Sequence, residues 1–416
     1  MQMEFYSGGI CMSVFVEPAK ELPVYGSYDT VVVGGGFAGI AAALAAARGG
    51  NKVLLCEKLF MLGGLGTAGL VTIYLPLCDG QGHQVSYGIA EELLRASIAH
   101  GAEVEYPSVW FGEGTIEERT AHRYRTRYNA AACAIAMEQL LLEAGVEILY
   151  GTSVCDVAVT DNSITHLMIE NKTGRSAVEV GNVVDCSGDA DVCHFAGEET
   201  VLHGRGNVLA GWYYYCDESG YNLRMLGFAD DPDAKKRRPQ DVGIVVNDLH
   251  YKGIDGRELS DFTIASHRSI YNAFLRNQEL TPTHMLATIA TTPQVRMTRR
   301  IAGVYTMDMA DNHRSFENSV GLFGNWKNKT GRGQIYELPY TALYGKKIKN
   351  LATAGRCVSA TDDMWEISRV IPVCAVTGEA AGTAAALGKN FAEVDVAELQ
   401  SVLRKNGVRL HENECL

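Results

Sequence analysis

Hydrophobic positions along the chain alternate between short strand-like runs and longer stretches with helical spacing. The strand-like runs are 31–33, 52–56 and 146–150, and the stretches with helical spacing are 40–47, 82–100 and 130–144. Apart from Lys52 and Glu147 the runs are apolar, as in strands buried on both faces of a parallel sheet. The stretch 101–128 is polar and is predicted to be a loop. This alternation predicts an α/β fold with a parallel sheet.

A different pattern, with strand-like alternation and closely spaced turns, occupies 152–184. The alternating runs are 154–159, 163–170 and 176–184, with turns at Asp161-Asn162 and Lys172-Thr173-Gly174. Such spacing predicts an antiparallel meander. Its last strand leads into a second sharp turn at 187–189.

The C-terminal part again shows the strand and helix pattern of the first part of the chain. A strand is predicted at 350–354, ending at Gly355, and Pro372 is well placed for the first turn of a helix over 373–387. The small residues of this helix are Ala375, Gly378, Ala381, Gly382 and Ala385. They form one face, so we expect the helix to pack very close to a neighbour.

These elements define a domain organisation. We predict a Rossmann-like nucleotide-binding domain, in which an antiparallel β-meander crosses over a parallel sheet, and an inserted α+β substrate or cap domain. The predicted ranges are 1–27 for a lead-in, 28–195 and 335–416 for the discontinuous nucleotide-binding domain, and 196–334 for the inserted domain. The last range is richer in aromatic and charged residues.

The first strand and helix enclose a glycine motif. Gly34 permits a tight turn, Gly36 lets the backbone approach a pyrophosphate, and Gly39 lets the helix sit close to the strand. The helix N-terminus then offers free N–H groups to phosphates. Glu57 closes the next strand, 23 residues after Gly34, where an acid can accept hydrogen bonds from ribose hydroxyls. The motif predicts an adenine dinucleotide site; the alternative is a glycine-rich structural turn.

Composition narrows the class of protein. The net charge is 37 − 49 = −12, which disfavours nucleic-acid binding. No apolar run reaches the ~18 residues of a membrane span, and the N-terminus does not resemble a signal peptide. The 11 cysteines contain no CxxC pair, so we expect no zinc or iron–sulfur site. Several should be small core residues in a reducing, cytoplasmic compartment.

Five segments together resemble one family. They are 28–36, 62–69, 184–191, 293–300, and 354–361 continued by 369–372 and 378–382. Over about 15–388 the chain resembles the FAD-dependent oxidoreductases of the fumarate-reductase-like and thiazole-synthase-like superfamily, and within it a large bacterial group.

The resemblance implies FAD as the tight cofactor. It implies that FAD is held by Gly34, Gly36, Phe37, Ala38, Gly39, Glu57, Lys58, Gly64, Leu65, Gly66, Thr67, Val154, Ser187, Gly188, Gly355, Arg356, Arg369, Val370 and Ile371. Val154 would serve the adenine, and 369–371 would lie at the flavin edge. Many relatives carry a histidine where this chain has Asp362, which puts any role of that histidine in doubt here.

Candidate catalytic residues lie outside the glycine motifs. If 294–301 is a strand, Arg296, Thr298 and Arg300 share one face, and the arginines can clamp a carboxylate or another anion; salt-bridged or solvated arginines are the alternative. His83 and Asp362 are candidates for acid–base roles, with a structural histidine and a turn or cap residue as alternatives. Arg369 is placed at the flavin by the resemblance.

The predicted function is hydride transfer between flavin N5 and a small polar organic substrate. A non-redox or complex-assembly flavoprotein and an NAD-binding dehydrogenase stay open as alternatives. No second GxGxxG motif follows 150, so electrons would pass to or from the substrate, oxygen, a quinone or a separate carrier. The oligomeric state is left open, with a homo-oligomer among the options.

Overall fold

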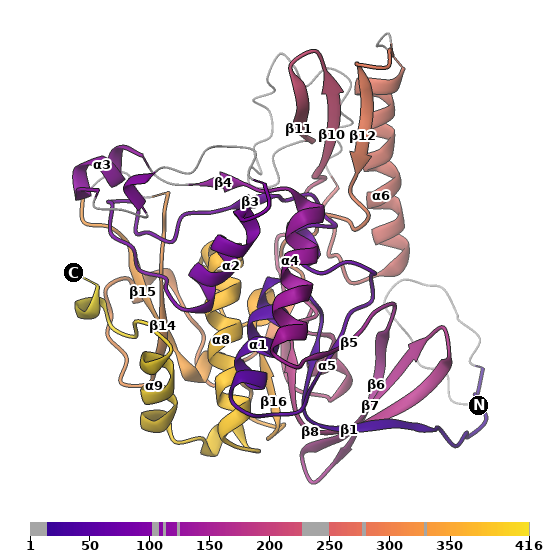
Figure 1. The fold of residues 1–416 in the computed structure, drawn as a ribbon. Helices are drawn as coiled ribbons and strands as arrows, with labels where there is room; N and C mark the ends of the chain where they lie inside the picture. Colours follow the sequence, from indigo (N-terminus) through magenta and orange to yellow (C-terminus); the bar gives the residue numbers. More distant parts are fainter. Residues whose placement is uncertain are drawn as a thin grey trace.

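A seven-stranded sheet forms the centre of the computed structural model, which describes residues 15–101, 108–110, 114–122, 125–226, 249–276, 280–327 and 331–415 (Figure 1). The sheet order is β5-β2-β1-β8-β7-β6, with β16 also paired to β8. Its strands are β1 (Val24–Val33), β2 (Val53–Cys56), β5 (Glu147–Leu149), β6 (Ser153–Thr160), β7 (Ser163–Asn171), β8 (Gly174–Asp185) and β16 (Leu351–Thr353). The predicted α/β class with a parallel sheet is confirmed.

The carboxyl ends of the parallel strands lie at one edge of the sheet. Val33 is opposite both Cys56 of β2 and Asp185 of β8, and Thr353 of β16 is opposite the same Asp185. Loops that follow these strands therefore meet at this edge, where open α/β sheets bind ligands.

Strand β8 belongs to two arrangements at once. Its first half pairs antiparallel with β7, from Gly174 opposite Asn171 to Glu179 opposite His166. Its second half pairs in parallel with β16. The meander predicted over 152–184 is thus confirmed. Strand β8 leads the chain from this meander into the parallel sheet.

Helices α1 (Phe37–Arg48) and α8 (Ile371–Leu387) pack directly against each other. A Cβ at Gly378 or Gly382 would overlap the carbonyl oxygens of Ala38 and Ala42, so the two backbones are in contact. The expected close packing of the small-residue face is confirmed, and its partner is α1. The other helices of this body are α2 (Ile89–Ile98), α3 (Ile116–Ala121), α4 (Ala130–Glu143), α5 (Asp191–Phe195), α7 (Asp362–Ser368) and α9 (Val396–Lys405).

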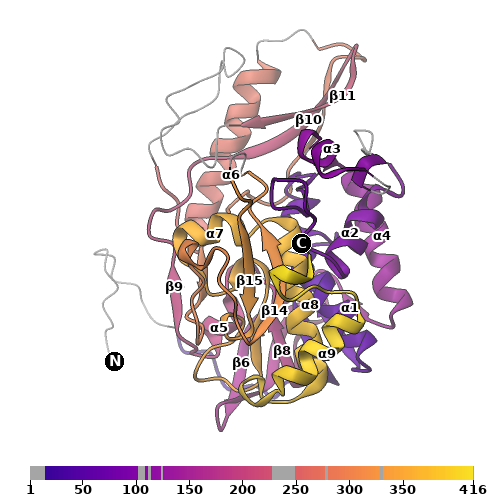
Figure 2. The same cartoon turned by 90° about the vertical axis from the view of Figure 1, so that its left-hand side faces the viewer.

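A smaller layer stands above the central body (Figure 1). It contains β10 (Gly211–Asp217), β11 (Gly220–Leu226), β12 (Met285–Ile289) and α6 (Gly256–Ile270), which continues as a π-helical turn at Tyr271–Leu275. The short pairs are β3 (Ile73–Tyr74) with β4 (Thr126–Arg127), β9 (Thr200–Leu202) with β13 (Arg299–Ile301), and β14 (Ser319–Gly324) with β15 (Ile335–Pro339). In Figure 2, β14 and β15 lie with α8 and α9 in the central body, so the domain limits, 335 among them, stay a prediction.

Three local predictions are corrected. The helix expected over 82–100 begins only at Ile89, because Gly88 has φ +65° and the preceding residues form turns. The polar stretch 101–128 contains α3, which starts with a capping box at Thr115. The strand expected over 294–301 is limited to β13, and residues 293–298 are irregular.

Long apolar helices are few in the described residues. None of them alone is long and apolar enough to cross a membrane. Helices α7 and α8 reach that length and composition only as a pair bent by 90°. Along α8 most side chains are buried inside the protein, including those of Val373, Cys374 and Val376.

Candidate functional site

The glycine turn after β1 opens onto a cavity. Gly34 has φ +100°, and a Cβ there would lie 2.5 Å from the carbonyl oxygen of Cys186. A Cβ at Gly39 would overlap the carbonyl oxygen of Gly34. At Gly36, the N-cap of α1, no atom lies within 4 Å of a Cβ. Two of the glycines therefore serve packing, and Gly36 faces open space at a helix N-terminus.

A second glycine loop lies on the first. The backbone N–H of Gly63 donates to the carbonyl of Gly35 over 2.8 Å, and a Cβ at Gly64 would lie 3.3 Å from the Cα of Gly36. Thr67 donates its hydroxyl to the Leu62 carbonyl, so it shapes the loop instead of lining the cavity. The backbones of the two loops are therefore in contact, and both loops line the cavity.

The cavity measures about 450 Å³, within the range of small-molecule and cofactor sites. Of the predicted cofactor residues it is lined by Gly34, Gly36, Phe37, Ala38, Glu57, Lys58, Gly64, Leu65, Gly66, Val154, Ser187, Gly188, Gly355, Arg356, Arg369 and Ile371. Gly39, Thr67 and Val370 are not among its lining residues. Segments from five separate parts of the chain thus meet around one site.

Glu57 stands at one end of this cavity with its carboxylate already engaged. It accepts hydrogen bonds from the backbone N–H of Gly35 over 2.6 Å and of Leu59 over 2.7 Å. Only 5% of the residue is exposed, and burial raises its pKa, opposed by these backbone donors. The carboxylate therefore braces both glycine loops, and its remaining lone pairs are available to a ribose.

Arg356 lines the cavity and binds the backbone of the segment 295–296. Its guanidinium donates to the carbonyls of Val295 over 2.5 Å and Arg296 over 3.2 Å, and it lies 3.5 Å from the Asp189 carboxylate. A Cβ at Gly188 would overlap this guanidinium. Gly188 is thus small because Arg356 lies over it.

The opposite end of the cavity is rich in positive charge. Arg369 lines it and forms an ion pair with Glu366. Burial, with Arg369 as a further cause, lowers the pKa of Arg296 to about 9. Burial also lowers the pKa of Lys327; Glu366 opposes this shift, and Arg369 and Arg296 add to it. Arg369 thus lies in a positive environment just before α8, to which Arg296 and Lys327 add, and this part of the cavity suits developing negative charge.

The structure separates Arg300 from Arg296. Because 293–298 is not a strand, the expected shared face is absent. Arg300 instead donates to Ser359 over 3.4 Å. Burial lowers the pKa of Arg300, and the charge of Asp362 opposes this shift. Asp362 lies 3.5 Å from Nδ1 of the buried His203. Neither Arg300 nor Asp362 lines the cavity. The predicted roles of these two residues stay predictions without support from their position.

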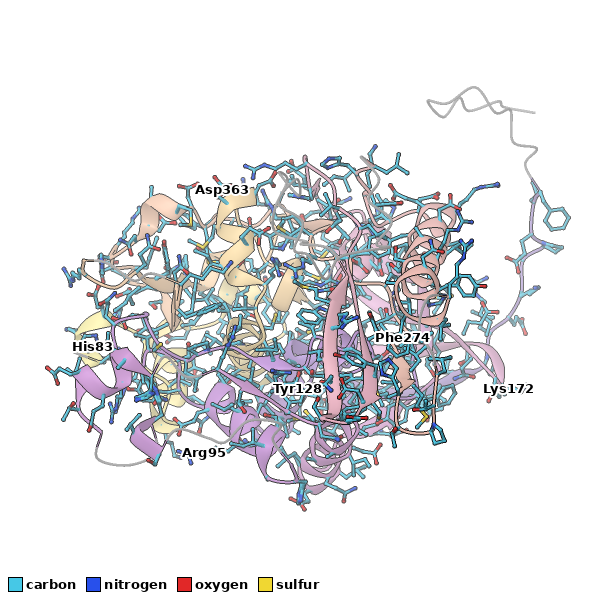
Figure 3. The ribbon with its side chains drawn as sticks, turned by 90° about the horizontal axis from the view of Figure 1, so that it is seen from above. His83, Arg95, Tyr128, Lys172, Phe274 and Asp363 are labelled. Carbon is cyan, nitrogen blue, oxygen red and sulfur yellow. The ribbon has the colours of Figure 1, made fainter. Side chains whose placement is uncertain are left out.

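His83 lies in another hollow, with Asp79, Arg332 and Glu412. Its Nδ1 is 3.0 Å from the Asp79 carboxylate. Figure 3 shows His83 at one side of the molecule, away from both Phe274 and Asp363. An acid–base role at the cavity therefore has no geometric support.

Several cavity residues were not predicted. The inserted range contributes Gly253, Leu259 and Thr292, which carry no recognisable motif. It also contributes Pro293 and Val295, which belong to the resembling segment 293–300 but were not predicted as cofactor residues. The second sharp turn contributes Asp189 and Asp191. Burial raises the pKa of Asp191 to about 6, and the carboxylates of Asp189 and Asp185 add to this shift. The turn at 187–189 and the resembling segment 293–300 were signals for this region, but nothing in the sequence placed residues 253–292 beside the cavity.

The residues present fit an adenine dinucleotide such as FAD. The open space at Gly36, the α1 N-terminus and the Arg356 guanidinium suit a pyrophosphate. Glu57 and Val154 suit an adenosine. The end that contains Arg369 and Ile371 then remains for the flavin ring.

The family that the sequence matches agrees with this fit. A sequence model of the family described as FAD dependent oxidoreductase matches residues 29–211 and 213–403. Among solved structures, p-nitrophenol 4-monooxygenase PnpA from Pseudomonas putida DLL-E4 is 13% identical, with 92% of this chain and 81% of that chain covered and a TM-score of 0.46. The open conformation of a flavocytochrome c3 fumarate reductase is 14% identical, with 87% and 78% covered and a TM-score of 0.40. THI4 from Thermovibrio ammonificans is 21% identical, with 43% and 66% covered and a TM-score of 0.30.

Proposed function

Because this chain belongs to the family of FAD-dependent oxidoreductases, we propose that it oxidises or reduces a small polar organic substrate by hydride transfer at flavin N5. FAD is the cofactor of the family, which decides against the NAD-binding alternative. The substrate and the hydride mechanism are the proposal.

One observation supports the proposal most. A single cavity is lined by the glycine turn at Gly36, by Arg369 and by residues of the inserted range. A dinucleotide along this path would have its reactive ring next to residues of both the nucleotide-binding body and the inserted range. A substrate held by the inserted range could then reach that ring.

The chain's own residues have separable tasks. FAD supplies the redox chemistry when it is bound. Arg356 holds the segment at 295–296 over the cavity. Arg369, Arg296 and the α8 N-terminus supply positive potential, which favours the more negative, reduced state of a bound group.

The purified protein tests this proposal directly. We expect a yellow protein with an absorbance band near ~450 nm that bleaches anaerobically when a suitable small organic substrate is added, without NADH or NADPH. Denaturation then shows whether the colour is released, and so whether the flavin is covalently attached.

Each other result has a defined meaning. A flavin that is bleached by NADH alone would contradict the proposed independence from nicotinamide. A flavoprotein that is never bleached by any organic compound, while it stays fully loaded, would favour the non-redox or complex-assembly alternative.

A further inference from the structure

The segment 293–298 forms part of the cofactor cavity although it is neither helix nor strand. Pro293 and Val295 line the cavity, and the next residue, Arg296, lies within electrostatic range of Arg369. An irregular segment cannot bond to itself as a helix does, so its buried backbone N–H and C=O groups need partners from elsewhere in the chain. These partners decide where the segment lies beside the cofactor.

The side chain of Asn207 supplies several of them. Its Oδ1 accepts hydrogen bonds from the backbone N–H of Arg296 over 2.8 Å and of Met297 over 3.1 Å. Its Nδ2 donates to the carbonyl of Met297 over 2.6 Å and to that of Tyr251 over 3.1 Å. An amide offers two acceptor and two donor positions, so all four are in use. Two N–H groups on one side and two carbonyls on the other fix which way this amide faces.

Asn207 joins this segment to a second one that lines the cavity. The backbones of Asn207 and Tyr251 exchange two hydrogen bonds, of 2.6 and 2.8 Å. Two residues further on, Gly253 lines the cavity, and a Cβ there would lie 2.3 Å from Cγ1 of Val295. Asn207 is only 6% exposed and is not among the lining residues. It therefore acts on the cavity only through the two segments that it holds.

The position of Arg296 depends on these backbone hydrogen bonds. Burial lowers the pKa of Arg296 to about 9; the charge of Arg369 adds to this shift, and that of Glu366 opposes it. Like charges repel, so the two guanidinium groups favour a larger separation than the backbone allows. Asn207 binds the N–H of Arg296, and Arg356 binds its carbonyl over 3.2 Å. The backbone of Arg296 is thus held from both sides.

We propose that Asn207 is a positioning residue, which holds the positive charge of Arg296 near the bound flavin and so raises the reduction potential of the flavin. The proposal rests on the place given above to the flavin ring, next to Arg369. Positive charge near the ring favours its more negative, reduced state, so the potential should fall when Arg296 moves away. Asn207 itself would not touch FAD, and its whole effect passes through Arg296.

A double-mutant cycle on the FAD-loaded protein tests the proposal. The reduction potential of the bound flavin is measured against a reference dye in the unchanged protein, Asn207→Ala, Arg296→Met and the double variant. Each single variant should lower the equilibrium constant for two-electron reduction about threefold to tenfold, which is ~15–30 mV. The double variant should match Arg296→Met, because Asn207 then has no charge left to position.

Asn350 offers a matched control. Its Oδ1 accepts from the N–H of Ile164, and its Nδ2 donates to the carbonyls of Ile164 and Gly181, each over 2.8 Å. It is 3% exposed, directly precedes β16 and is not among the cavity residues. Asn350→Ala should lower the melting temperature about as much as Asn207→Ala does, because both remove several buried hydrogen bonds. It should leave the flavin potential unchanged, so a shift reports position and not stability.

Hydrogen exchange locates the change without FAD or substrate. In Asn207→Ala the amide hydrogens of Arg296 and Met297 lose their acceptor, so peptides over 293–298 should exchange faster. In Asn350→Ala these peptides should exchange as in the unchanged protein. If Asn207→Ala does not retain FAD, Asn207→Ser replaces it in the cycle, since its hydroxyl still supplies a polar partner.

Three results would overturn the proposal. The first is an unchanged potential in Asn207→Ala or in Arg296→Met. The second is a pair of shifts that add in the double variant, because Asn207 would then act by another route. The third is unchanged exchange over 293–298 in Asn207→Ala. No organic substrate enters these measurements, so a flavoprotein that no organic compound bleaches can still complete the cycle, and a failed cycle leaves the proposed hydride transfer intact.

Discussion

At the scale of single residues, the three glycines of the first turn differ in what surrounds the missing Cβ. At Gly34 and Gly39 that position is occupied by backbone carbonyls, and at Gly36 it is open. One sequence motif therefore combines two structural requirements with one binding requirement. The difference can be measured.

Gly36→Val should leave the protein folded and weaken FAD binding by at least about tenfold, because the added side chain occupies the space of the pyrophosphate. Fluorescence titration of the flavin-free protein measures the affinity. The melting temperature is compared in the flavin-free state, since a bound ligand raises it by itself.

Gly39→Ala is the matched contrast. Its Cβ overlaps the Gly34 carbonyl, so we expect a loss of roughly 1–3 kcal/mol in unfolding free energy. If Gly36→Val unfolded the protein as readily as Gly39→Ala, the assignment of Gly36 to binding would be wrong.

Glu379 is a buried acid with a structural task. Its carboxylate accepts from the backbone N–H of Ile89 over 2.8 Å, at the start of α2. Burial raises its pKa from an ordinary 4.5 to about 8; Glu92 adds to this, and the Ile89 N–H and Arg48 oppose it. The folded protein therefore binds this proton more tightly than the unfolded chain does.

A dependence of stability on pH follows from this shift. The stabilisation by the protonated group is fully present below about pH 4.5 and is lost as the pH rises through about 8. The Glu379→Gln variant should lack this loss, which is on the order of a few kcal/mol. Urea unfolding of both proteins at several pH values between 5 and 9 measures it, and parallel curves would contradict the prediction.

At the scale of elements, the contact between α1 and α8 depends on the absence of side chains. The carbonyls of Ala38 and Ala42 occupy the positions of the Cβ atoms missing from Gly378 and Gly382. This close approach sets the position of the α8 N-terminus, where Ile371 and Cys374 line the cofactor cavity. Packing between the helices and the shape of the site are therefore linked.

Gly378→Val should lower the unfolding free energy by at least ~2 kcal/mol, because the helices must separate. It should also weaken FAD binding, because the cavity wall moves with α8. Gly256→Ala is the control in another helix, since its Cβ would enter open space. A stable Gly378→Val protein with unchanged FAD affinity would show that the contact does not position the site.

At the scale of the whole molecule, the cofactor cavity is shared between the central body and the inserted range. Arg356 is the most direct link, through the carbonyls of Val295 and Arg296 and the carboxylate of Asp189. The guanidinium is held in the interior, with 17% of its side chain exposed. FAD binding and the position of the segment 295–296 should therefore both depend on Arg356.

Arg356→Met should weaken FAD binding by about tenfold or more, and Arg356→Lys should restore only part of it, because an ammonium cannot bridge both carbonyls in the guanidinium geometry. Titration of the flavin-free proteins with FAD gives the comparison. The control is Arg205→Met, which removes an exposed pair with Asp363. Full rescue by lysine would mean that only the charge of Arg356 matters.

The dinucleotide site, the sheet and the small-residue helix were predictable from local patterns in the sequence, whereas FAD itself was implied by the family resemblance. Their signals are local: a glycine turn between a strand and a helix, an alternating meander, and small residues on one helical face. Each depends on backbone geometry that nearby residues impose on one another, so a short segment contains the information.

The arrangement of the substrate side was decided by the tertiary structure. Arg296 lies with Arg369, Arg300 lies near Asp362, and His83 lies in a separate hollow, although the sequence suggested one shared site. Likewise, Trp212 and Ser266, from segments without any motif, line one cavity together with Gln294 of the segment 293–300. Such groupings depend on long-range packing between segments, which no local pattern of hydrophobic and polar residues specifies.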